Sequence, residues 1–120
     1  MLILIATPRA VALSAFADAL AQDTGAELRF ADSWPNVEAT VRTLAPAFVV
    51  LDEGLEGGAP LDLARRLVMV DAMVNVAVVS GLGAEAFHEA SEGLGILAPV
   101  PLEPGAADGA ALAQVFRRFL

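Results

Sequence analysis

The sequence predicts a doubly wound α/β fold, a three-layer sandwich with helices on both faces of one parallel sheet. Short apolar segments alternate with segments of helical periodicity along the whole chain. Several of the apolar segments are continuous rather than alternating, which is typical of strands buried on both faces. A length of 120 residues suits one core. We therefore expect a single domain spanning residues 1–120 with right-handed crossovers.

The first half of the chain contains two strand and helix pairs. Residues 2–6, LILIA, form the first apolar run, and residues 27–31 form the second. Between them an apolar stripe repeats at helical spacing, formed by Leu13, Phe16, Ala17 and Leu20. A second stripe lies in residues 37–44, after Ser33 and Pro35, which are residue types that begin helices.

The second half continues the alternation. Residues 47–51 and 75–80 are the most continuous apolar runs, and residues 96–98 are the last candidate strand. The helical stripes that accompany these strands lie in residues 63–70, 84–92 and 112–119, of which the middle one is the weakest. The chain therefore reads as five repeats of a strand followed by a helix.

Composition and charge exclude several classes of function. Fifteen acidic residues against seven basic ones give a net charge of -8, which disfavours direct binding to nucleic acid or to an anionic membrane surface. Cysteine is absent, all seven basic residues are arginine, and one histidine is present, so thiolate, lysine-amine and zinc chemistry are excluded. We do not expect an enzyme.

The apolar start lacks a preceding positive charge, and the longest uncharged stretch, residues 72–84, is shorter than the roughly 20 residues of a membrane span. We expect a cytoplasmic domain.

In a doubly wound fold, ligands bind beyond the carboxyl ends of the strands. The residues predicted there are Thr7, Pro8, Asp52, Glu53, Ser80, Gly81 and Val100. Several of them, in this order, resemble the receiver domain of two-component response regulators. The run Val49-Val50-Leu51-Asp52 is similar to the family's phospho-acceptor strand, Ser80-Gly81 to its hydroxyl residue and small neighbour, and Val100-Pro101 to its Lys-Pro pair. The resemblance implies a flavodoxin-like sheet of order 2-1-3-4-5, a cis Val100–Pro101 bond and Asp52 as the candidate phospho-acceptor.

The sequence departs from that family at the residues that carry the family's phosphorylation chemistry. Thr7-Pro8 stands where the family has the acidic pair that holds Mg²⁺, Val100 replaces its lysine, and Leu97 replaces its switch aromatic. One remaining carboxylate would hold Mg²⁺ weakly, so we expect no cofactor and weak or absent Mg²⁺ binding. With the metal ligands and the cation gone, the sequence predicts a degenerate pseudo-receiver. In that case Asp52 is a solvated carboxylate whose removal changes stability little, and Ser80 is a turn residue.

A candidate contact face combines the fourth helix, the fifth strand and the fifth helix. In the family this face serves dimerisation and output, and here it pairs acidic with basic residues. The residues proposed for it are Glu85, Glu89, Glu92, Leu97, Leu102, Arg117 and Arg118. A two-fold dimer would set each acidic helix against the arginines of the other copy.

Three functions follow as hypotheses. The first is a signal-transduction module that binds itself or a protein partner, such as a histidine kinase, an effector domain or an adaptor, without a phosphorylation switch. The second keeps the switch, with Asp52 phosphorylated by a partner kinase. The third is a small-ligand or flavin-binding domain, for which Thr7-Pro8-Arg9 offers only one hydroxyl to a phosphate.

Overall fold

A computed structural model describes residues 1–119, in which five strands alternate with five helices. The strands are β1 (Leu2–Ala6), β2 (Glu27–Ala31), β3 (Phe48–Leu51), β4 (Asn75–Val79) and β5 (Ile96–Val100). The helices are α1 (Ser14–Thr24), α2 (Trp34–Leu44), α3 (Pro60–Val70), α4 (Ala84–Ser91) and α5 (Ala106–Arg117). The predicted alternation is confirmed. No helix in the described residues combines the length and apolarity needed to cross a membrane.

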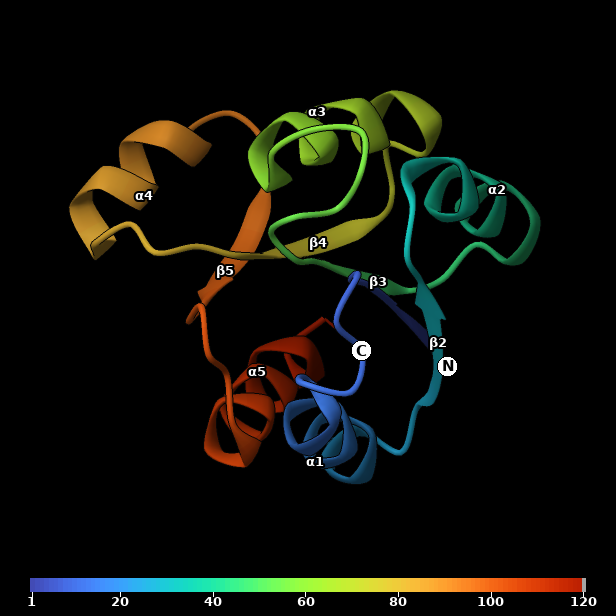
Figure 1. The fold of residues 1–120 in the computed structure, drawn as a ribbon, viewed down its shortest axis with the longest axis vertical. Coiled ribbons are helices and arrows are strands. Elements are labelled where there is room, and N and C mark those ends of the chain that lie inside the picture. Colours follow the sequence, from blue (N-terminus) through green and yellow to red (C-terminus); the bar gives the residue numbers. More distant parts are fainter. Residues whose placement is uncertain (120) are drawn as a thin grey trace.

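All strand pairs are parallel, and the sheet has the order β2-β1-β3-β4-β5. In Figure 1, α1 and α5 lie below the sheet, and α2, α3 and α4 lie above it. The predicted three-layer doubly wound fold and its strand order are therefore confirmed.

The core has two layers because the central strands are buried on both faces. Ile3 and Ile5 of β1 face the layer of α1 and α5, whereas Leu4 faces the layer of α2, α3 and α4. Phe48 and Phe116 stack in the first layer with their ring centroids 3.9 Å apart. This two-sided burial explains why the central strands read as unbroken apolar runs.

Strand β5 lies at one edge of the sheet and differs most from the prediction. It extends two residues beyond the predicted end and includes Pro99. An edge strand tolerates proline because the missing N–H faces outward from the ladder. The expectation of a cis Val100–Pro101 bond is wrong: all peptide bonds within residues 1–119 are trans. Trans is the more stable X-Pro form by about 0.5–1 kcal/mol.

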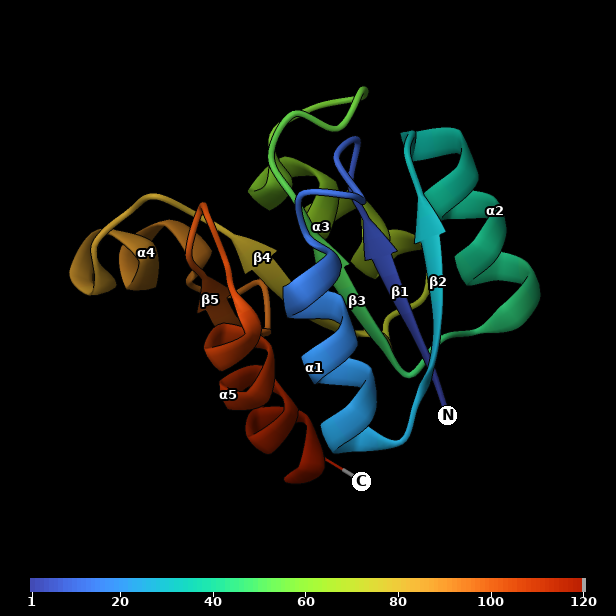
Figure 2. The ribbon, with the colours of Figure 1, turned by 60° about the horizontal axis from the view of Figure 1, so that its bottom comes forward.

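Figure 2 shows that the β1–α1 connection, the β3–α3 connection and the start of α2 lie at the same end of the sheet. This is the end at which the parallel strands finish, so the predicted site residues from different strands meet there. The adjoining helices α1 and α5 lie side by side on one face in both views.

The close contact of α1 with α5 depends on Gly109. A Cβ atom added at Gly109 would lie 2.2 Å from the backbone oxygen of Phe16. Gly109→Ala should therefore lower the free energy of unfolding by about 1–3 kcal/mol, the usual range for overpacking. Urea unfolding measures this loss. Gly83→Ala is the matched control, since a Cβ at Gly83 meets nothing within 4 Å; equal effects of the two changes would contradict the packing argument.

Candidate functional site

Asp52 is the first residue after β3 and the most buried acidic side chain of the site. Its backbone N–H donates to the carbonyl of Ala6 at 2.9 Å, which extends the pairing of β3 with β1 by one residue. The neighbouring Thr7 extends β1 in the same way, donating to the carbonyl of Ala31 at 2.8 Å. Asp52 has 0% of its surface exposed. A carboxylate taken out of water in this way needs compensating partners.

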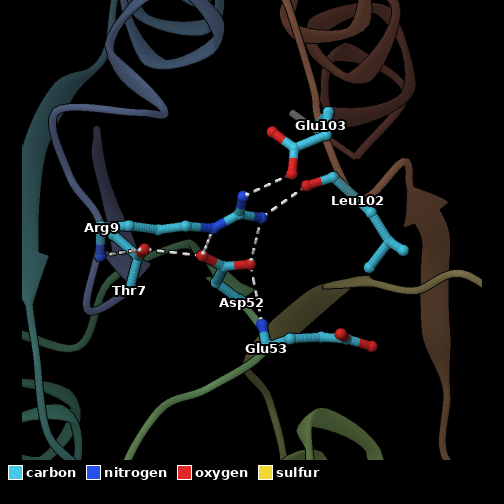
Figure 3. A network of polar contacts seen from close by, with 6 residues as sticks. All are labelled: Thr7, Arg9, Asp52, Glu53, Leu102 and Glu103. Carbon is cyan, nitrogen blue, oxygen red and sulfur yellow. Dashed lines mark hydrogen bonds and ion pairs between the residues drawn. The ribbon is translucent and has the colours of Figure 1, made fainter.

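Arg9 provides the charge partner. Its Nε donates to Asp52 Oδ2 at 2.8 Å and its Nη2 to Asp52 Oδ1 at 3.0 Å, so the ion pair is bidentate. The Arg9 side chain keeps 29% of its surface exposed. Figure 3 shows the guanidinium facing both oxygens of the carboxylate. Bidentate arginine–carboxylate pairs are among the strongest and most directional contacts of protein side chains.

Two further donors complete the environment of Asp52. The hydroxyl of Thr7 donates to Oδ2 at 2.7 Å, and the backbone N–H of Glu53 donates to Oδ1 at 2.8 Å. The side chain of Glu53 extends away from the carboxylate (Figure 3). The expectation of a solvated Asp52 is wrong, because its side chain is fully buried. The charge is stabilised by an ion pair and hydrogen bonds instead of by water.

The order Thr-Pro-Arg explains why Arg9 turns back toward Asp52. Proline fixes its own φ near −65°, which restricts the backbone between Thr7 and Arg9. The backbone N–H of Arg9 then donates to Thr7 Oγ1 at 3.0 Å, a local side-chain turn. The Thr7 hydroxyl therefore accepts from Arg9 and donates to Asp52 at the same time.

Arg9 also connects Asp52 to the segment after β5. Its Nη1 lies 3.3 Å from Glu103 Oε1, and its Nη2 donates to the carbonyl of Leu102. The hydrogen bond to Asp52 and the charges of Asp52 and Glu103 raise the pKa of Arg9 above its ordinary value. Arg9 is therefore charged throughout the accessible pH range. One guanidinium thus holds together the ends of β1, β3 and β5.

This arrangement corrects the expectation that the site has lost its cation. The family's lysine position is Val100, whose side chain is buried in the core layer of α1 and α5. The cation comes instead from the loop after β1. The sequence signal was available: Arg9 lies three residues after the predicted end of the first strand, and a buried acid requires a counter-charge.

The donors at this site do not form a set that Mg²⁺ prefers. Mg²⁺ binds carboxylates and water in octahedral geometry. Both Asp52 oxygens already accept hydrogen bonds, and the side chains of Thr7 and Pro8 add no carboxylate. Within residues 1–119, no three His, Cys, Asp or Glu side chains cluster in a metal-binding arrangement.

The other predicted residues of the strand ends have structural roles. The Ser80 hydroxyl accepts from the backbone N–H of Leu82 at 3.1 Å, as expected of a turn residue. A Cβ at Gly81 would lie 2.8 Å from Leu102 Cδ1, so glycine lets Leu102 pack over the end of β4. The segment after β5 is therefore held from two sides, by Gly81 and by Arg9.

The residues predicted for the contact face lie on both sides of β5, because α4 and α5 cover opposite faces of the sheet (Figure 1). Leu97 is half-buried and packs against the core, whereas Leu102 is 40% exposed. Arg117 donates to the carbonyl of Asp23 at the end of α1. Glu85, Glu89, Glu92, Arg117 and Arg118 are all exposed.

Comparison with known proteins supports the fold. No protein-family model and no curated protein sequence matches the chain. Solved structures match over nearly its whole length. A LuxR-family two-component response regulator from Aurantimonas sp. SI85-9A1 has a TM-score of 0.79 at 17% identity, covering 98% of this chain and 83% of that one. The chemotaxis response regulator CheY4 of Vibrio cholerae has a TM-score of 0.78 at 12% identity, covering 99% and 98%. A receiver domain protein from Methanospirillum hungatei JF-1 has a TM-score of 0.76 at 16% identity, covering 98% and 91%. The chain has the flavodoxin-like fold of receiver domains.

The ion pair of Arg9 with Asp52 is expected to stabilise the fold. Arg9→Ala leaves a buried carboxylate without its charge partner and should cost about 2–4 kcal/mol of unfolding free energy, less than the largest losses for fully buried pairs because Arg9 is partly exposed. Asp52→Asn should cost about 1–3 kcal/mol, in contrast to the small effect predicted for a solvated residue.

A double-mutant cycle separates this coupling from general destabilisation. Arg9→Ala/Asp52→Asn should lose about 1–3 kcal/mol less than the sum of the single changes. Arg65→Ala removes an arginine from the exposed pair with Asp62 (3.2 Å) and should cost less than about 1 kcal/mol. Additive effects of Arg9→Ala and Asp52→Asn in urea unfolding would contradict the proposed coupling.

Proposed function

We propose that this domain is a receiver-type signal-transduction module that acts through protein contacts, without Mg²⁺-dependent phosphorylation of Asp52 and without enzymatic activity. The observation that carries the proposal is the bidentate ion pair between Arg9 and the buried Asp52. Among the solved structures of the same fold, the three compared above are two response regulators and a receiver domain protein. A cytoplasmic location is part of the proposal.

The geometry disfavours Asp52 as a nucleophile. Each of its oxygens accepts two hydrogen bonds, so a phosphodonor would have to displace at least one of these donors from the attacking oxygen. Phosphoryl transfer depends on positioning and on neutralising the transferred group, commonly with a metal ion. Arg9 supplies one positive charge, but two carboxylates, Asp52 and Glu103, already share it.

The surface proposed for contacts is the face of α4, β5 and α5. Exposed glutamates of α4 and the exposed Arg118 after α5 give it both charge signs, and Leu102 adds apolar area. Rim ion pairs set orientation more than affinity, so Leu102 provides the apolar contact. Self-association or docking of a kinase, effector domain or adaptor is the proposed use.

Incubation with acetyl phosphate and Mg²⁺ tests the phosphorylation part of the proposal. Intact-mass spectrometry should find no Asp52-dependent adduct, because the carboxylate is occupied by Arg9, Thr7 and the Glu53 amide. A phosphorylatable response regulator serves as positive control, and Asp52→Asn identifies adducts formed elsewhere. A near-stoichiometric adduct on the wild type that Asp52→Asn abolishes would favour the alternative, a phosphorylated receiver.

Sedimentation velocity tests the contact face. At low salt the domain should form concentration-dependent dimers, which should weaken at high salt, since charges separated by more than about 8 Å are screened at physiological ionic strength. Arg118→Glu should weaken the dimer. Arg117 is left unchanged because it also contacts the end of α1. Arg65→Glu on α3 is the matched control, and a wild type that stays monomeric at every concentration would rule out this dimer.

A further inference from the structure

A large hollow lies beside the Arg9 site and is not used by the function proposed above. It is an open groove of about 1000 Å³ between the β1–α1 loop, the end of β2 and the exposed side of α2. Its lining includes Arg9 and Val11 from the loop, Phe30 and Asp32 from β2 and the residue after it, and Asn36 and Ala39 from α2. The groove begins at the end of the sheet that also holds Asp52.

The groove exposes apolar side chains that the fold does not use. Val11 is 90% exposed and Phe30 is 48% exposed, and both lie outside the two core clusters. Ala10, Ala12 and Ala39 are exposed as well. Single exposed apolar residues are normal, but an apolar set gathered around one hollow is typical of an interaction site.

The loop that forms one wall is fixed at both ends. At its start, Arg9 is tied to Asp52 by two hydrogen bonds. At its end, the Leu13 amide donates to the Arg9 carbonyl at 3.2 Å, the Ser14 amide donates to the Val11 carbonyl at 3.2 Å, and the Leu13 side chain is buried. The wall is therefore formed before binding, which lowers the ordering cost of binding.

The charge of the groove selects its occupant. The Arg9 guanidinium is already paired with Asp52 and Glu103. Asp32 is exposed, accepts one hydrogen bond from Asn36 at 3.3 Å, and has no ion-pair partner within residues 1–119. The charge left uncompensated in the groove is therefore negative, like the net charge of -8 of the whole chain. A second acidic copy of this chain is disfavoured here, because the groove offers it no unpaired cation.

We infer that this groove docks a segment of a partner protein that places a bulky apolar side chain between Val11 and Phe30 and a neighbouring lysine or arginine on Asp32. In this view Asp52 has an architectural use: through Arg9 it holds one wall of the docking groove. The inference does not depend on the absence of phosphorylation or on the face of α4, β5 and α5.

A random 12-residue peptide library displayed on phage is the probe. Phage that bind the Val11→Asp/Phe30→Asp variant are first removed from the library. The remaining phage are then selected for binding to the wild type. Both changes are at exposed positions, and circular dichroism and urea unfolding check that the variant is folded. Enriched peptides should combine a bulky apolar residue with an adjacent lysine or arginine, and amide shifts in NMR titration should map to the loop after β1, the end of β2 and α2.

Affinities of the selected peptides then test the residues one at a time. Val11→Asp should weaken binding at least tenfold and Asp32→Asn severalfold, whereas Met69→Asp, at an exposed apolar position on α3 outside the groove, should leave it unchanged. The inference is overturned if no peptide is enriched, if enriched peptides are acidic, or if Val11→Asp binds as tightly as the wild type. It is also overturned if sedimentation shows self-association that Val11→Asp abolishes, since the occupant is then a second copy. A negative outcome of the peptide experiments would not change the outcome of the acetyl phosphate experiment or of the sedimentation of Arg118→Glu. The two proposals can therefore fail independently.

Discussion

A buried carboxylate that must be neutralised is the constraint on which the strand-end site depends. Asp52 follows a strand with no exposed side chain and has no water-exposed surface of its own. An unpaired charge in that position is strongly unfavourable, so a cation has to lie within hydrogen-bonding distance. Arg9 meets this need from the loop after β1, and its remaining N–H groups reach the segment after β5 (Figure 3). Neutralising one charge therefore fixes three separate connections of the fold.

Those three connections border both surfaces that we associate with binding. The loop that carries Arg9 continues into Val11 and forms a wall of the groove, whereas Leu102 belongs to the face of α4, β5 and α5. Arg9 contacts each of these segments directly. A bidentate ion pair to a buried carboxylate holds the segments beside these surfaces in one arrangement. The buried position of Asp52 is thus explained by the architecture of the strand ends.

The sequence predicted the fold well because its signals are local or depend on burial alone. Continuous apolar runs such as residues 47–51 require two-sided burial, which in an alternating chain means a doubly wound sheet. The extra length of β5 was missed because Pro99 is unfavourable in most strands and is tolerated only at an edge. The sequence predicted where the site lies, but it did not predict which side chains interact there. Arg9 and Asp52 are 43 residues apart, and their pairing depends on the turn that Thr7 and Pro8 impose. The position of Arg9, three residues after the predicted end of the first strand, was the signal that Asp52 had a cation within reach.

The same pairing commits both Asp52 oxygens to donors that a magnesium ion would have to displace. Carboxylates at positions 7 and 8 would compete with Asp52 for Arg9, and an aspartate at position 7 would also lack the hydroxyl proton that Thr7 donates. Removing Arg9 alone would expose the charge of Asp52 without supplying metal ligands. A change that converts this site into a set of magnesium ligands would therefore have to replace Arg9 and add carboxylates together. In the present arrangement the partner of the buried carboxylate is an arginine of the same chain, so a positive charge lies beside Asp52 without any bound ion being needed.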